Sequence, residues 1–182
     1  MVYEIQTSEI RRYLPKLRIG DRVFLSGTIY TSRDAAHKRI FEALDAHAPL
    51  PYDIQDAIIY YAGPTPAQEN MAVGSCGPTT SGRMDRFAPR LLDLGLAAMI
   101  GKGDRSSELI EAIKRNGAVY FAATGGAGAL IAQHIQQADV IAYEDLGCES
   151  VKTLKVDHLP LIVAIDAAGE DLYKEGPRAY CH

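Results

Sequence analysis

Arginine, lysine, threonine and histidine side chains recur at one kind of place in this sequence, the loop between a strand-like run and the next helix. The richest stretch is residues 77–85, where two glycines and a proline shape a loop, hydroxyl residues follow and Arg83 stands near the start of an apolar helical period. Backbone N–H groups at a helix start bind anions, and an arginine beside them strengthens that binding. A capped helix start with an exposed arginine has the same pattern, so this stretch alone leaves both readings open.

Two further loops place cations at the same kind of position. Arg33 and His37 stand four residues apart at the start of a predicted helix, and Lys102 stands between two glycines after a predicted strand. Ligands of open α/β sheets bind at the carboxyl ends of the strands, so we expect Arg33, Arg83 and Lys102 to form one basic pocket. Arginine binds a carboxylate or phosphate through two hydrogen bonds, so the pocket suits a small dianion.

His37 is a candidate general base or hydrogen-bond partner. The positive end of the helix dipole and the neighbouring arginines both favour its neutral imidazole. A surface histidine on a basic helix face has the same sequence signature, and that alternative stays open here.

Two glycine-rich loops suggest nucleotide sites without matching them. Residues 101–103 are too short for a phosphate-binding P-loop, and residues 124–128 lack the third small residue of a dinucleotide fingerprint because Ile131 stands at that offset. We interpret residues 124–128 as close helix–strand packing, or as a backbone surface that faces a ligand or partner.

Apolar runs and helical periods alternate along the chain. The patterns predict strands at 21–30, 57–62, 70–74, 97–100, 118–122, 140–143, 150–156 and 161–165. They predict helices at 8–15, 34–46, 80–94 (with a kink or restart at Pro89), 106–116 and 128–136. This alternation indicates one α/β domain over residues 1–182 with parallel strand pairing, and the strand-rich ends indicate an additional β layer.

Composition sets the class of protein. With 182 residues, 47% hydrophobic content and a net charge of −4, we expect a globular cytoplasmic protein with no nucleic-acid or membrane partner. The three cysteines, Cys76, Cys148 and Cys181, are far apart, which argues against a disulfide or a complete metal or iron–sulfur site built by this chain alone. Cys76 directly precedes the 77–85 stretch, and we interpret it as a small buried residue.

Several of these motifs, in this order, make the chain similar to the β subunit of the iron–sulfur (class I) fumarases and the related L(+)-tartrate dehydratases. The resemblance covers most of the chain and rests on Thr28 and on residues 33–39, 61–64, 77–85, 101–103, 125–126 and 143–147. Residues 61–64, 83–85 and 143–147 look more like fumarase than tartrate dehydratase. Pro89 departs from the family pattern.

The resemblance implies a swivelling β/β/α domain, in three layers with a largely parallel central sheet. It also implies a separate α subunit that carries a [4Fe–4S] cluster, and an assembly such as α2β2. The implied reaction is the reversible hydration of fumarate to (S)-malate, with L(+)-tartrate dehydration as the enzyme alternative. A module that only binds an anionic metabolite is the alternative from a different class.

The resemblance also assigns roles to single residues. Arg33, Arg83 and Lys102 match the substrate-binding cations of the family. Thr79 matches a residue proposed to handle the proton on the carbon beside a carboxylate, and Arg83 is placed to stabilise its alkoxide. His37 matches an active-site histidine of the tartrate dehydratase branch, so Thr79 and His37 are rival or cooperating proton carriers.

Overall fold

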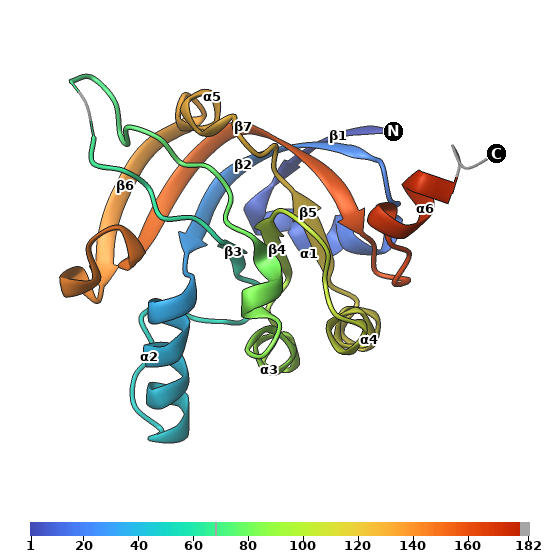
Figure 1. The fold of residues 1–182 in the computed structure, drawn as a ribbon, viewed down its shortest axis with the longest axis horizontal. Coiled ribbons are helices and arrows are strands. Elements are labelled where there is room, and N and C mark those ends of the chain that lie inside the picture. The colour runs from blue at the N-terminus through green and yellow to red at the C-terminus, as the bar shows by residue number, and fades with distance from the viewer. Residues whose placement is uncertain (68, 179–182) are drawn as a thin grey trace.

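The structure is a computed structural model that describes residues 1–67 and 69–178. Its described residues form a mixed α/β fold around a sheet whose strands are mostly parallel (Figure 1). The strands are β1 (Val2–Gln6), β2 (Arg22–Thr31), β3 (Ile58–Tyr60), β4 (Ala98–Gly101), β5 (Val119–Ala122), β6 (Ile135–Ala142) and β7 (Val151–Ile165). The helices are α1 (Ile10–Tyr13), α2 (Asp34–Asp45), α3 (Ala88–Asp93), α4 (Ser107–Asn116), α5 (Gly128–Ala132) and α6 (Leu172–Arg178).

The strand order is β1-β2-β3-β4-β5-β7-β6. Strands β1 to β5 pair in parallel with their neighbours, whereas β7 runs antiparallel to β5 and β6. β7 also pairs antiparallel with β2, so the pairing returns to the strand that leads into α2. The predicted parallel pairing is therefore confirmed for the central strands.

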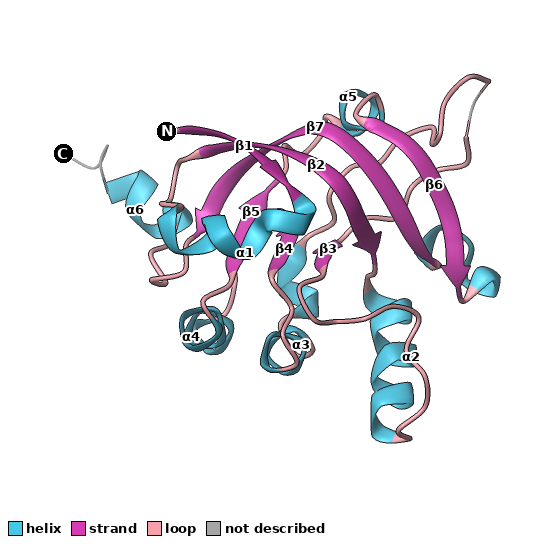
Figure 2. Ribbon diagram, turned by 180° about the vertical axis from the view of Figure 1, so that it is seen from behind, coloured by secondary structure: helices cyan, strands magenta, loops and turns pink. Residues whose placement is uncertain are grey.

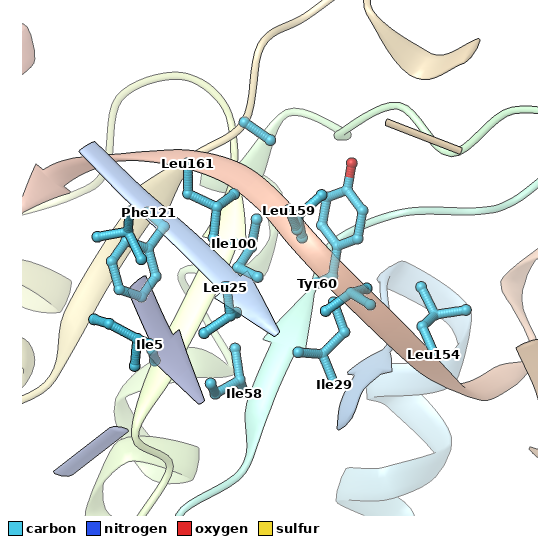
Figure 3. Close-up of a cluster of buried hydrophobic side chains, with 14 of the residues drawn as sticks. Ile5, Leu25, Ile29, Ile58, Tyr60, Ile100, Phe121, Leu154, Leu159 and Leu161 are labelled. Carbon is cyan, nitrogen blue, oxygen red and sulfur yellow. The ribbon is translucent and has the colours of Figure 1, made fainter. Parts of the chain in front are cut away.

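Strands β3, β4 and β5 are buried on both faces. Alternate residues such as Ile58, Ile100 and Phe121 pack against β1, β2 and β7 in one hydrophobic cluster (Figure 3). The intervening residues, such as Met99 and Tyr120, pack against α2, α3 and α4 in a second cluster. Those helices lie together on one side of the central strands (Figure 2). Alternation along a pleated strand produces both clusters from one run of apolar sequence.

Local capping signals confirm several predicted boundaries. The Ser106 side chain accepts a hydrogen bond from the Leu109 N–H, and Gly117 ends α4 in the left-handed conformation with φ of 59°. The predicted break at Pro89 is also confirmed, because a 3₁₀ turn at Ser81–Met84 precedes α3, in whose first turn Pro89 lies.

Other predicted elements are wrong. The predicted helix at 128–136 ends at Ala132, because Ile135 already pairs with Val156 in β6. Residues 70–74 form no strand. The two predicted tail strands are one strand, β7, which runs through Pro160; at that residue β7 pairs only with β2, so a missing N–H is tolerated as at a sheet edge. β1 was not predicted.

In the part of the chain that the structure describes, every helix is too short or too polar to cross a membrane.

Candidate active site

The three cationic loops meet at the carboxyl ends of the central parallel strands. The loop after β3 receives residues 77–85 through a bridge between Ala62 and Pro78 and through the Thr79 N–H, which donates to the Tyr61 carbonyl at 2.7 Å. Thr80 then forms a parallel bridge with Lys102, beyond the end of β4. Backbone hydrogen bonds therefore insert the 77–85 stretch between two strand ends, which the sequence pattern could not specify.

Arg33 and Arg83 converge on one carboxylate. Nη2 of Arg83 lies 3.1 Å from Asp34 Oδ2, and Nε of Arg33 lies 3.5 Å from the same oxygen. The same Nη2 of Arg83 donates to Thr79 Oγ1 at 3.1 Å. Arg33 has a second partner, Glu149, whose Oε1 lies 3.0 Å from its Nη2. The structure thus brings Arg33, Arg83 and Thr79 into one cluster that sequence reasoning predicted without its two carboxylates.

Glycines give the arginine and lysine side chains room. A Cβ at Gly63 would lie 3.1 Å from Nη1 of Arg33, and a Cβ at Gly125 would lie 3.4 Å from Cδ of Lys102. The glycines of the 124–128 loop therefore face Lys102, and Gly128 packs against Gly77, with 3.0 Å between its hypothetical Cβ and the Gly77 nitrogen. This agrees with the interpretation of that loop as a close-packing backbone surface.

His37 lies beneath the cluster and is fully buried. Its Nδ1 lies 2.8 Å from the Ser32 hydroxyl, and its ring packs against the rings of Tyr61 and Phe87. Burial lowers the pKa of His37 to about 4, so the imidazole is neutral at pH 7. The neutral form agrees with the prediction, whereas the alternative of a surface histidine is wrong. Thr79, by contrast, is partly exposed.

The cysteines take no part in the cluster. Cys76 is buried, and burial raises the pKa of its thiol to about 12, which makes it unreactive. Cys148 is exposed, and Cys181 lies outside the described residues. In the described ranges no three histidine, cysteine or acidic side chains gather as metal ligands.

The carboxylates of the 143–147 run do not orient the pocket. Residues Glu144–Glu149 form a 3₁₀ turn, as the turn reading of this run favoured, and Asp145 pairs with Arg39 at 2.7 Å. Glu149, just after the run, is the residue that contacts Arg33. Sequence reasoning missed Asp34 and Glu149 as partners; the adjacency of Asp34 to Arg33 was the one available signal.

The arrangement is able to bind an anion and to hold a proton beside it. Arg83 is 51% exposed and therefore reaches solvent from its anchored position. A hydroxyl that accepts a hydrogen bond from a guanidinium is a better acid than a free alcohol, because the cation stabilises its alkoxide.

Comparison with known proteins places this arrangement. Residues 2–176 match the family model described as Fumarase C-terminus. The chain is 36% identical to the aerobic class I fumarate hydratase of Salmonella typhimurium, over 96% of this chain and 30% of that protein. It is 37% identical to fumarate hydratase 2 of Leishmania major, over 92% of this chain and again 30% of the relative.

A third relative is closer in length. The chain is 40% identical to a protein of Methanocaldococcus jannaschii with the provisional name L(+)-tartrate dehydratase subunit beta, over 91% of this chain and 88% of that protein. The chain thus spans under a third of the two fumarate hydratases and most of the beta subunit. The match over residues 2–176 shows that this chain belongs to the Fumarase C-terminus family.

Proposed function

We propose that this chain is the β subunit of a hydro-lyase that reversibly hydrates fumarate to (S)-malate. The observation that carries the proposal is the contact between Arg83 and the Thr79 hydroxyl, at 3.1 Å, in a cluster that also holds Arg33 and has Lys102 on its neighbouring loop. Three cations bind a dicarboxylate, and the hydroxyl exchanges a proton with the carbon beside one carboxylate. Relatives named as fumarate hydratases support this reaction.

In the proposed mechanism, Arg33 and Lys102 bind and orient the substrate carboxylates. During hydration Thr79 gives its proton to one alkene carbon while a hydroxyl group adds to the other, and Arg83 stabilises the resulting alkoxide. Thr79 returns to its protonated form by taking a proton from water. Because His37 is buried and tied to Ser32, we assign the proton transfer to Thr79 and give His37 the role of supporting the loop that carries Arg33.

A [4Fe–4S] cluster does not fit the residues of this site. Guanidinium, ammonium and hydroxyl groups are not iron ligands, whereas such clusters require several thiolates. We therefore propose that a partner α subunit carries the cluster, which supplies a Lewis acid to the reaction when bound. The length of the fumarate hydratase relatives supports a partner, since about two thirds of each lies outside the match to this chain.

L(+)-tartrate dehydration is the second candidate reaction. The Methanocaldococcus relative favours it, because that protein matches this chain along 88% of its own length. The same cations would bind the carboxylates of tartrate, so the two candidates differ in substrate and not in the residues proposed here.

We also propose a single domain over residues 1–182, in which the two hydrophobic clusters separate the three layers of a swivelling β/β/α fold. Such a domain would form a hetero-oligomer with the α subunit, such as α2β2, in the cytoplasm. The two clusters on opposite faces of β3 to β5 support the layered arrangement.

Reconstitution tests the proposed function. The chain purified alone should be colourless and inactive, and anaerobic mixing with the cluster-bearing α subunit should produce fumarate hydration, followed by the loss of fumarate absorbance. L(+)-tartrate serves as the second substrate in the same assay. Dicarboxylate binding with no turnover of either substrate after mixing would favour the binding module instead.

A further inference from the structure

Arg105 is a buried cation beside the site that the proposed chemistry does not use. Its side chain is 0% exposed, and its Nε donates to Asp85 Oδ1 at 2.6 Å. The guanidinium carbon lies 5.4 Å from the ring centre of Tyr61 and 4.6 Å from that of Tyr120. Nη2 is buried and has no hydrogen-bond partner among the described residues.

The Arg105–Asp85 pair joins the two loops that carry substrate-binding cations. Asp85 is two residues after Arg83, and Arg105 is three residues after Lys102. The second carboxylate oxygen of Asp85 accepts from the Ser106 N–H at 2.6 Å. Both oxygens of one carboxylate therefore connect the 77–85 stretch to the loop after β4.

Ser81 makes a second connection between the same loops. Its Oγ accepts from the Lys102 N–H at 3.1 Å and from the Tyr120 hydroxyl at 2.9 Å. The ring of Tyr120 packs against the Arg105 guanidinium, so the ion pair and the serine share one wall. A shift of Arg105 would therefore reach the backbone of Lys102 as well as that of Arg83.

Stability alone does not account for this ion pair. Desolvating two charges costs about as much as their attraction returns, and apolar side chains of similar volume often replace a buried ion pair without loss. A planar guanidinium between two tyrosine rings does fix geometry, because its fork, its stacking and its partner all set its orientation.

We infer that Arg105 is a positioning residue, which through Asp85 sets the placement of Arg83 and Thr79 relative to Lys102. The inference rests on the proposed function, in which those three side chains act on one substrate. A displacement of about 1 Å at a reacting group costs about 100-fold in rate, so loss of the pair should lower turnover although Arg105 never contacts substrate.

The experiment compares variants in the reconstituted complex. Arg105→Met leaves Asp85 buried and uncompensated, whereas the double variant Arg105→Met/Asp85→Asn removes both charges and keeps an amide oxygen for the Ser106 N–H. The matched control is Arg115→Met, which breaks the exposed pair with Asp93 at 2.7 Å. Each variant is measured for kcat, KM, Tm and amide hydrogen exchange over residues 77–85 and 101–106.

The inference predicts a split between stability and turnover. The double variant should melt within about 4 °C of the wild type, the shift that corresponds to a change of about 1 kcal/mol at this size. Its kcat should still fall by about 100-fold, with a smaller change in KM, and exchange should accelerate in both segments. Arg105→Lys should recover part of kcat, and the Arg115 control should match the wild type.

A folded double variant with kcat within about threefold of the wild type would overturn the inference. If the double variant does not fold, Arg105→Lys and Asp85→Asn are judged by the same measurements. If the wild-type complex turns over neither substrate, the proposed function fails, and the exchange data then decide alone: unchanged exchange in both segments contradicts a positioning role for Arg105.

Discussion

Arg83→Ala should lower fumarate hydration far more than it lowers stability. The guanidinium contacts Asp34 and Thr79, each at 3.1 Å, and is 51% exposed. An exposed ion pair contributes about 0–1 kcal/mol to stability, so the alanine variant should unfold within about 1 kcal/mol of the wild type. Its effect on the reaction has two parts.

The first part is a charge-assisted hydrogen bond to a substrate carboxylate, which contributes about 1.5–3 kcal/mol. The second is stabilisation of the Thr79 alkoxide, for which loss of one donor costs about 2.7–4 kcal/mol. One guanidinium supplies both and the terms do not add fully, so we expect kcat/KM to fall by at least about 10³-fold. Much of that loss should be in kcat, because the alkoxide forms only during the reaction.

The assay is steady-state fumarate hydration by the reconstituted complex, with urea unfolding of the isolated variant as the stability measurement. Arg86→Ala is the matched control, because Arg86 belongs to the same segment but packs on the Phe87 ring with 4.5 Å between its guanidinium carbon and the ring centre. The control should keep wild-type turnover. Arg83→Ala with kcat/KM within about threefold of the wild type would refute the role assigned to Arg83.

Two further outcomes follow from buried groups. Burial lowers the pKa of His37 from 6.5 to about 4, so the unfolded chain takes up a proton before the folded chain does, and the free energy of unfolding should fall by about 3 kcal/mol between pH 6.5 and pH 4. His37→Gln should lack that part of the pH dependence in urea titrations, and identical slopes would contradict the assignment. Gly101→Ala should destabilise the chain by about 1–3 kcal/mol, because its Cβ would collide with Ser81 Oγ and lie 3.1 Å from Tyr61 Cδ2. Gly82→Ala, whose nearest neighbour atom lies at 3.5 Å, is the control in the same unfolding assay and should change stability less.

Helix α4 shows which parts of the fold the sequence could predict. Its start at Ser106, its apolar period and its end at Gly117 are all local signals, and the structure follows each of them. The central strands were equally predictable, because runs such as 57–62 and 118–122 are apolar on both faces. The convergence of three cationic loops then followed from parallel pairing alone.

Strands β6 and β7 show what local patterns could not specify. β6 is an edge strand whose register is set by β7, and β7 continues through Pro160 because it takes three different strands as neighbours along its length. The carboxylates around Arg33 were hidden for a similar reason. Glu149 lies more than a hundred residues away in the chain, and only the β2–β7 pairing brings its turn beside α2.

Those carboxylates bear on how the site selects its ligand. Asp34 and Glu149 offset part of the charge of Arg33 and Arg83, so attraction by net charge alone is modest. Arginine carries five N–H donors, and in the described contacts Arg83 uses only Nη2. The acidic partners therefore fix the direction of the guanidinium groups and leave donors for a substrate, which reduces the side-chain entropy lost on binding. Selectivity then depends on two carboxylates spaced to reach Arg83 and Lys102 together, and this geometry favours a short dicarboxylate over a single anion of equal charge.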